Sequence, residues 1–286
     1  MQPFDSLDRL ERLSALDPVV SRVRRSVNSV LQPQSLRDLL HGVWLGHPLH
    51  PVLVDVPIGA WTSAALLDLV PRTGPAVGLL IGTGMASAVP AAATGLADWS
   101  ALNPAESRTG LVHAAFNTTA IALYGASLVA RARGRRMKGK ALGFAGLTSV
   151  MVGGMIGGHL SYRRAAGANH NAQLPDVAPT GWTDVGLLAE LPEGKLARRD
   201  VGTVPVLLLR RDRQVHALAE QCSHLSGPLS EGELIHEGGP CVVCPWHGST
   251  FRLTDGSVVH GPATAPQPVF ETRVLSDHVE VRLTQQ

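Results

Sequence analysis

Apolar and polar positions follow two different patterns along the chain, and the change falls after residue 160. Before it, the sequence holds four apolar blocks of about 20 residues, the length that crosses the hydrocarbon core of a bilayer as a helix. These blocks are Pro51–Val70, Pro75–Ala97, Gly110–Ala130 and Ala141–Leu160. The pattern predicts an α-helical four-helix transmembrane bundle, and a buried soluble bundle is the alternative.

After Trp182 the chain changes to short runs of β-branched and other apolar residues. Val204–Leu209 and Val215–Ala219 flank a polar break and predict a hairpin, and Val269–Val274 with Val279–Leu283 predict another. We therefore expect a small all-β antiparallel sandwich after the bundle.

Two further segments complete the predicted order. Leu7, Leu10 and Leu13 recur at helical spacing, so residues 4–41 are expected to form one or two amphipathic helices, on the membrane surface or against the rest of the protein. Residues 161–180 show no periodic pattern. The predicted domains are an amphipathic amino-terminal segment (1–46), a four-helix membrane domain (47–162), a linker (163–180) and a β domain (181–286).

Composition supports a membrane protein. Charged residues are 17% of the 286 residues, below the roughly 25% usual for soluble domains. The formal net charge of +2 indicates no nucleic-acid partner. The first 30 residues mix arginines with acidic residues and hold no clean apolar core, so no secretory signal is expected.

The candidate chemistry lies in two short boxes, Cys222-Ser223-His224 and Cys244-Pro245-Trp246-His247. Each box contains one cysteine and one histidine. Two thiolates on one iron and two imidazoles on the other are the ligands of a mixed-ligand [2Fe–2S] centre. A structural zinc ion bound by the same four residues is the alternative, although Cys-x-His is a tight spacing for a zinc knuckle.

These boxes resemble those of a Rieske [2Fe–2S] domain, and the resemblance covers residues 181–284. The spacer between the boxes has 19 residues, and Gly227-Pro228-Leu229, Gly248-Ser249-Thr250-Phe251 and Gly261-Pro262-Ala263 also match the family pattern. The resemblance implies that Cys222 and Cys244 bind one iron, and that His224 and His247 bind the other.

The resemblance also bears on the type of domain and on its potential. The bc-complex type carries an extra cysteine in each box, but the matching residues here are Gly227 and Trp246, as in ferredoxin-type members. Ser249 matches a serine whose hydroxyl donates to a cluster sulfur, with a turn-capping hydroxyl as the alternative. Phe251 replaces the tyrosine of high-potential members, so we expect an intermediate potential. Cys241 matches no ligand and is interpreted as a small buried residue.

The helical half resembles the bacterial membrane domain of unknown function 2231, over residues 36–162. The matching residues are His47-Pro48-Leu49-His50-Pro51, Asp55, Pro57, Gly59, Asp98-Trp99 and His113. That family has no established activity, so the resemblance implies a topology and no function.

With four crossings, most ionisable groups of the bundle fall at one membrane face, where polar groups are costly and often functional. The members of this candidate membrane-face site are His47, His50, Asp55, Asp98, His113 and His159. Three interpretations remain open: two histidines hold a haem, histidine and aspartate bind a metal ion or a quinone head group, or these groups cap helix ends and meet lipid headgroups. The sequence favours no single histidine pair.

Orientation signals conflict within this multi-pass cell-membrane protein. The break from Arg131 to Lys140 holds six basic residues, which the positive-inside rule places in the cytoplasm, and four crossings would then put the Rieske-like domain outside. The absence of a bracing disulfide fits a reducing compartment. On that ground we expect the domain on the cytoplasmic side.

The expected function is one-electron transfer by a membrane-anchored iron–sulfur protein, an electron-transfer component of an oxidoreductase. The expected partners are the membrane and either a quinone or haem at the membrane face or a separate redox protein. An oxygenase needs a further iron site with two histidines and a carboxylate, so oxygenase activity by this chain alone is not expected. A redox-sensing or assembly protein with a regulatory cluster is the alternative.

Overall fold

The structure of the protein is a computed structural model that describes residues 5–284. The described residues form two compact units. The helical unit extends to Gln32 and continues from Leu49 to Ala166, and the β unit combines Pro33–Pro48 with the residues from Gly167 onward.

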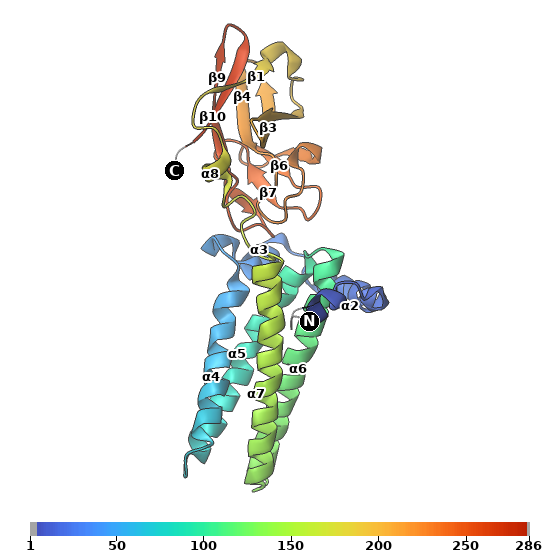
Figure 1. Cartoon of the computed structure of the whole chain (residues 1–286), viewed down its shortest axis with the longest axis vertical. Coiled ribbons are helices and arrows are strands. Elements are labelled where there is room, and N and C mark those ends of the chain that lie inside the picture. Colours follow the sequence, from blue (N-terminus) through green and yellow to red (C-terminus); the bar gives the residue numbers. More distant parts are fainter. Residues whose placement is uncertain (1–4, 285–286) are drawn as a thin grey trace. The chain divides into compact units, whose positions relative to one another are not determined.

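Four long helices run side by side in the helical unit (Figure 1). They are α4 (Leu49–Leu67), α5 (Gly74–Ser100), α6 (Pro104–Ala132) and α7 (Arg136–Gly158), the last followed by a π-helical turn (His159–Arg163). Helix α6 begins where Asn103 Oδ1 accepts the amide of Glu106 at 3.1 Å, and a side-chain cap of this kind satisfies an amide that the helix leaves unbonded. Each predicted apolar block becomes one helix, so the predicted helical bundle is confirmed.

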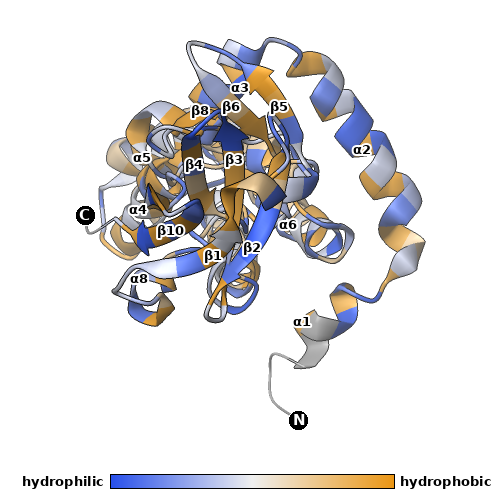
Figure 2. Cartoon of the chain, turned by 90° about the horizontal axis from the view of Figure 1, so that it is seen from above, coloured by the Kyte–Doolittle hydropathy of each residue, from blue (hydrophilic) through white to orange (hydrophobic). Residues whose placement is uncertain are grey.

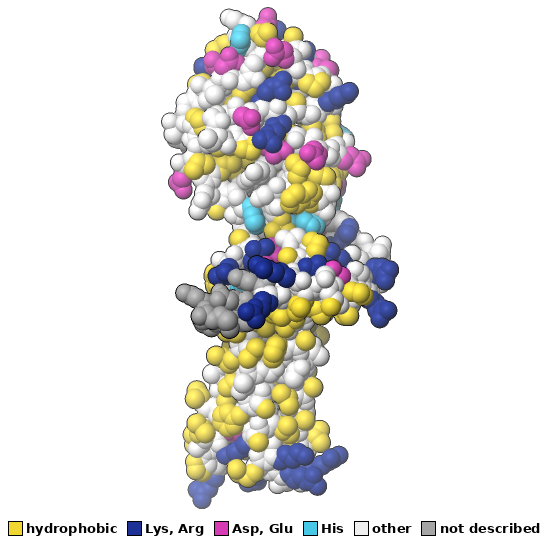
Figure 3. Space-filling view, turned by 45° about the vertical axis from the view of Figure 1, so that its right-hand side comes forward, with side chains coloured by type: hydrophobic (Ala, Val, Ile, Leu, Met, Phe, Trp, Pro, Cys, Tyr) yellow, Lys and Arg dark blue, Asp and Glu magenta, His cyan; other side chains and the backbone are white. Residues whose placement is uncertain are grey.

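The bundle has the surface of a membrane protein. In the described chain, three helical segments are long and apolar enough to cross a bilayer: Gly74–Ser100, Pro104–Ala132 and Arg136–Arg163. Only 28%, 17% and 33% of their most apolar windows are buried within the chain, so most of this apolar surface faces outward, as it does in lipid. Figure 3 shows hydrophobic side chains over the visible face of the bundle and Lys and Arg gathered toward both of its ends. Helix α4 is outside this set, so four crossings remain a prediction.

The two helical hairpins, α4–α5 and α6–α7, repeat the same arrangement. Three residues of the first hairpin have a counterpart 63 residues later in the second. The pairs are His50 with His113, Trp61 with Tyr124, and Asp68 with Arg131. Each of these equivalent pairs is in contact: the histidine rings lie 6.3 Å apart, Trp61 stacks on Tyr124 at 4.5 Å, and Arg131 bonds Asp68.

Contacts between equivalent residues are the mark of two-fold symmetry, and parallel repeats in membrane proteins are related by an axis along the membrane normal. Helix α4 packs against α5 and α7, and α6 packs against the same two helices. Helices α4 and α6 therefore occupy opposite corners of the bundle, and the paired side chains lie between them. The 63-residue repeat was the sequence signal that could have predicted these pairs.

Shorter helices precede the bundle. They are α1 (Asp5–Leu10), a 3-10 turn (Ser14–Leu16), α2 (Asp17–Val30) and, in the β unit, α3 (Gln34–His41) with a 3-10 turn (Val43–Leu45). Apolar and polar residues mix along α2 (Figure 2). In the helical unit Arg108 bonds Asp17 at 2.6 Å and Arg24 donates to the Leu102 carbonyl at 2.8 Å. The amphipathic segment therefore packs on the bundle through α1 and α2.

The β unit contains two antiparallel sheets. One has the order β1-β10-β9-β4-β3-β2 and the other β5-β6-β7-β8. The strands are β1 (Thr183–Leu187), β2 (Leu196–Val201), β3 (Val204–Arg211), β4 (Gln214–Ala219), β5 (Glu233–His236), β6 (Pro240–Val243), β7 (Thr250–Arg252), β8 (Val258–His260), β9 (Val269–Leu275) and β10 (His278–Leu283). Short helical segments lie at Leu174–Val177 (α8), Leu188–Glu190 and Leu229–Glu231. Both predicted hairpins are present, as β3–β4 and β9–β10.

Inward-facing apolar residues build two cores in the β unit. One joins β1, β3, β4, β9 and β10. The second joins Leu207, Leu209 and Leu218 of the larger sheet to Phe251 of the smaller one, and it includes the buried side chains of the two box cysteines. The loops that carry the boxes therefore rest on a packed apolar base, which restricts their movement.

The ion pair between Asp68 and Arg131 predicts a stability effect. Its partners are only 6% and 14% exposed, and breaking a buried pair costs about 3–5 kcal/mol because one charge is left uncompensated. Asp68→Asn should lower the thermal unfolding temperature of the detergent-solubilised protein markedly. Asp55→Asn, which changes an exposed residue of the same helix, is the matched control, and equal melting of the two variants would contradict the prediction.

Candidate redox site in the β unit

Two loops of the β unit close with the same backbone hydrogen bonds. In the first, the amide of Cys222 donates to the carbonyl of Gly227 at 2.9 Å, and the amide of Ser226 donates back to the carbonyl of Cys222 at 2.8 Å. In the second, the amide of Cys244 donates to the carbonyl of Ser249 at 2.8 Å, and the amide four residues after the cysteine donates back at 3.1 Å. Both boxes thus lie on six-residue loops of matched shape, one after β4 and one between β6 and β7.

The two loops bring cysteine next to cysteine and histidine next to histidine. The thiols of Cys222 and Cys244 are close enough for each to shift the pKa of the other, and the rings of His224 and His247 lie 5.1 Å apart at 88°. In residues 5–284, no group of three or more His, Cys, Asp or Glu side chains is placed to hold one metal ion. This arrangement suits two metals with two protein ligands each better than one metal with four.

The two thiols differ in their pKa. That of Cys244 is lowered to about 7, first because Cys222 donates to it and then because the amides of Trp246 and His247 point at its sulfur. The pKa of Cys222 is raised by the same hydrogen bond and by burial. Amides directed at a sulfur favour the thiolate, which is the form that binds iron.

His224 is held in the neutral form that metals require. Its pKa is lowered to about 3, chiefly by burial, and further by the neighbouring His247, His41 and His170. Its Nδ1 atom is buried and has no hydrogen-bond partner within the described residues. A buried nitrogen of this kind is costly without a partner, and a bound metal ion would supply that partner.

Two glycines allow the loops to approach each other. Gly248 adopts φ = 79°, a left-handed conformation that side chains disfavour. A Cβ atom on Gly227 would lie 2.8 Å from the sulfur of Cys244 and 3.1 Å from the ring of Trp246. A side chain at position 227 would therefore displace the sulfur of Cys244, and only glycine lets the two loops approach this closely.

A buried glutamine, which the sequence did not single out, positions the first loop. Gln267 is fully buried, and its Oε1 accepts the amide of Ser223 at 3.1 Å. Its Nε2 donates to the carbonyls of Ala219, at 2.7 Å, and Gln221. The segment after Gly167 adds two bonds: Asn171 donates to the Gln221 carbonyl at 2.7 Å, and the amide of His170 donates to the Ser223 carbonyl at 2.9 Å.

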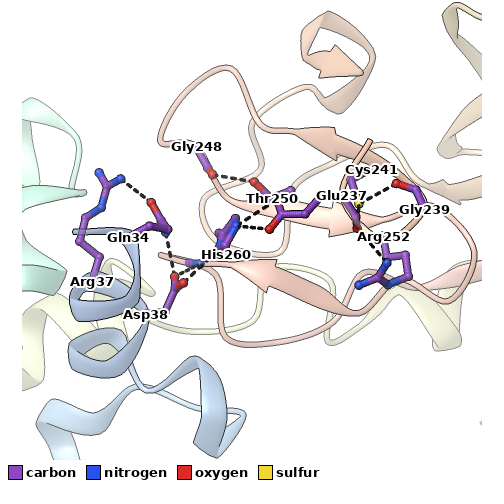
Figure 4. Close-up of polar contacts among 11 residues, drawn as sticks. Gln34, Arg37, Asp38, Glu237, Gly239, Cys241, Gly248, Thr250, Arg252 and His260 are labelled. Atoms are coloured by element: carbon purple, nitrogen blue, oxygen red, sulfur yellow. Dashed lines mark hydrogen bonds and ion pairs between the residues drawn. The ribbon is translucent and has the colours of Figure 1, made fainter. Parts of the chain in front are cut away.

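Helix α3 is also anchored to the β unit (Figure 4). Asp38 accepts from His260 Nδ1 and from the amide of Gly261, both at 2.9 Å. His41, on the same helix, is only 4% exposed and contributes to the electrostatic environment of His224. The segment at residues 33–48 is thus part of the surroundings of the first box.

Comparisons with known proteins identify these loops. A family model described as Rieske [2Fe-2S] domain matches residues 181–271, and one described as Predicted membrane protein (DUF2231) matches residues 46–170. Ferredoxin CarAc of Metapseudomonas resinovorans is 33% identical over 35% of this chain and 92% of its own length. The chain belongs to the Rieske [2Fe–2S] family. It carries a [2Fe–2S] cluster and has a role in electron transfer at a membrane.

A second ferredoxin relative agrees. The anthranilate 1,2-dioxygenase ferredoxin subunit of Burkholderia cepacia is 31% identical over 36% of this chain and 92% of its own length. Among solved structures, the ferredoxin of carbazole 1,9a-dioxygenase from Nocardioides aromaticivorans has 24% identity, covers 36% of this chain and 98% of its own, and has a TM-score of 0.34. The residues of the Rieske unit fit the cluster, because they supply a sulfur pair, an imidazole pair and an unpartnered buried Nδ1 atom.

Three residues near the Rieske boxes, Ser249, Phe251 and Cys241, differ in their contacts. Ser249 is fully buried, and its hydroxyl oxygen accepts the amide of Ala263 at 2.9 Å, so its own proton is left to donate elsewhere. Phe251 packs in the second core and carries no donor. The thiol of Cys241 points to the carbonyls of Glu237 and Gly239, at 3.6 and 3.5 Å (Figure 4), which fits a structural residue.

The six residues of the candidate membrane-face site have different surroundings in the structure. His50 and His113 meet inside the bundle. His159 is buried and its Nε2 lies 3.1 Å from Glu11 Oε1. The remaining three residues have other surroundings: Asp55 is exposed, Asp98 is half-buried near the end of α5, and His47 belongs to the β unit.

Gly227→Ala should impair the Rieske site without unfolding the domain. The added methyl group would meet the sulfur of Cys244 at 2.8 Å, so the sulfur must move away from its partner. Iron and acid-labile sulfide per chain should fall by at least half. Gly181→Ala, where a Cβ meets nothing within 4 Å, is the control, and full cluster content in both variants would refute the steric argument.

Asp38→Ala should release α3 from the Rieske unit. The change removes a hydrogen bond to a backbone amide and an ion pair with His260, worth about 1–3 kcal/mol together. Amide hydrogen exchange of residues 34–45 and of Gly261 should become faster. Glu237→Ala removes the more exposed partner of His260 and should change little; unchanged exchange in Asp38→Ala would show that the anchor lies elsewhere.

Proposed function

We propose that this protein is a membrane-anchored Rieske protein that passes single electrons, with one iron held by Cys222 and Cys244 and the other by His224 and His247. The observation that carries the assignment is the pairing of sulfur with sulfur and imidazole with imidazole by two matched loops. A single zinc ion would need all four side chains around one point, and no such group occurs in the described part of the chain.

When bound, the cluster supplies reversible one-electron chemistry. The protein's own groups set the conditions for it. The amides of Trp246 and His247 favour the Cys244 thiolate, burial keeps His224 neutral, and the Ser249 hydroxyl has a proton to donate. His247 is half-buried and Trp246 is 55% exposed. We propose that the edge at these two residues is where a partner docks for electron exchange.

We propose that the partner is a quinone or haem at the membrane face or a separate redox protein. Relatives in the comparison are named as ferredoxin subunits of dioxygenases, and ferredoxins act by transfer to another protein. We place the Rieske unit on the cytoplasmic side, because the three cysteines are free thiols and no disulfide braces the site. The basic break between α6 and α7 is the opposing signal.

The test is an EPR-monitored redox titration of the detergent-purified protein. We expect a rhombic signal from the reduced mixed-ligand cluster. Its midpoint potential should lie between that of all-cysteine ferredoxins, about −400 mV, and the high end of Rieske centres, about +300 mV. Bound zinc without this signal would refute the assignment. An easily lost cluster that no quinol analogue or ferredoxin reductase reduces would favour the sensing or assembly alternative.

The potential should depend on Ser249 and on residue 251. Ser249→Ala should lower the midpoint, and Phe251→Tyr should raise it, because a donor to the cluster stabilises its more negative reduced state. The shift is about 60 mV for each 1.4 kcal/mol of hydrogen-bond energy gained on reduction. Thr250→Val is the control, since that hydroxyl donates to the Gly248 carbonyl at 3.2 Å. Equal midpoints in all variants would mean that Ser249 only caps a turn.

A further inference from the structure

The helical unit contains a second pair of histidines, separate from the cluster boxes. His50 of α4 and His113 of α6 lie at equivalent positions of the repeat, on helices at opposite corners of the bundle. Their ring centroids are 6.3 Å apart and their planes cross at 84°. Two imidazoles that meet across a two-fold axis are candidates for a symmetric ligand pair.

Hydrogen bonds determine the tautomer of both rings. His50 Nδ1 lies 2.8 Å from the carbonyl of Ala91, and His113 Nδ1 lies 2.7 Å from the carbonyl of Gly153. A carbonyl only accepts, so each Nδ1 carries the proton and each Nε2 keeps its lone pair. Metal-ligating histidines are oriented in this way, with the second ring nitrogen bonded to a carbonyl or carboxylate.

Asn117 does not block the lone pair of His113. Its amide nitrogen donates to the His113 carbonyl at 3.0 Å and lies 3.2 Å from Nε2 and 3.5 Å from Nδ1 of the same ring. An atom in line with the Nε2 lone pair would be much farther from Nδ1 than from Nε2. The amide therefore lies against the face of the imidazole and helps to hold its orientation.

Glycines of the neighbouring helices make room for both rings. A Cβ atom on Gly95 of α5 would lie 2.8 Å from the His50 ring, and one on Gly157 of α7 would lie 3.1 Å from the His113 ring. The two glycines take corresponding places beside the two rings and are 62 residues apart, one fewer than the 63 residues between the histidines. The helix segments beside the pair, 91–95 and 153–158, consist mostly of alanine and glycine, which leaves little side-chain bulk against a flat group.

The number of ligands selects the class of metal centre. No third His, Cys, Asp or Glu joins the pair to form a metal-binding group in residues 5–284, and bare ions in proteins usually take three or more protein ligands. Haem iron takes four ligands from its porphyrin and needs only axial ligands from the protein. Metal–imidazole bonds of about 2.0–2.1 Å on opposite sides of one metal would separate the ring centroids by about 6–6.5 Å, and the observed separation falls in this range.

We propose that His50 and His113 are the two axial ligands of a haem in the core of the helical bundle, bound through their Nε2 atoms. Facing helices of four-helix bundles are a common place for such cofactors. Haem binding does not depend on the cluster. Its use as the membrane-side partner of the cluster rests on the proposed electron-transfer function.

The test is haem content and spectroscopy of the full chain, produced with added hemin and purified in detergent. We expect about one haem per chain with the absorption bands of a low-spin, six-coordinate haem. Because the imidazole planes are nearly perpendicular, the ferric EPR signal should be strongly anisotropic, with one dominant low-field feature. A hemin-supplied protein without haem, or a bound metal ion without porphyrin, would overturn the proposal.

Five variants separate axial ligation from folding and from the cluster. His50→Ala and His113→Ala should each abolish the low-spin signal, and His47→Ala, an exposed histidine of the β unit, should keep it. His113→Met should retain haem with a raised potential, because methionine is an alternative axial ligand; a merely structural histidine would not give this result. Low-spin haem in both alanine variants would overturn the assignment. Cys222→Ser should lose the cluster and keep the haem, so failure of the cluster assignment and failure of the haem proposal are distinguishable.

Discussion

The redox site depends on the way in which two short loops close on themselves. Each loop uses the amide and carbonyl of its cysteine for two backbone hydrogen bonds, so the thiol and the imidazole project from a backbone that is closed on itself. The loops rest on an apolar core shared by both sheets, and Gln267 ties the first to the carbonyls of Ala219 and Gln221. An electron-transfer centre benefits from this rigidity, because a site that reorganises little on reduction exchanges electrons with a low barrier.

The helical unit solves a different problem, which is to keep polar side chains inside an apolar bundle. It does so by pairing equivalent residues across a two-fold axis: histidine with histidine, Trp61 with Tyr124 and Asp68 with Arg131. Small residues on α5 and α7 receive the larger rings, so the same glycines that permit close helix packing also shape the interior. A repeated hairpin therefore yields a symmetric interior, and that interior is where a symmetric cofactor fits.

The segments directly before and after the helical bundle are part of the β unit. Residues 33–48 and the residues after Gly167 lie in the β unit, where Asp38, His170 and Asn171 bond to its loops. The sequence shows no periodicity at 161–180 and predicts a linker over residues 163–180. Irregular backbone can instead satisfy its polar groups against a neighbouring domain, which is what these residues do.

The sequence alone determined what depends on residue type and spacing. The apolar blocks predicted helices, the β-branched runs predicted strands, and two Cys–His boxes in the Rieske pattern predicted a mixed-ligand cluster. Tertiary structure decided which distant groups meet. Gln267 lies 44 residues from the loop that it positions, and of six polar residues grouped at one membrane face His50 and His113 come into ring contact. The reason is physical: a helix's length follows from local hydrophobicity, but its rotation, and so the direction of each histidine, is set by packing against its neighbours.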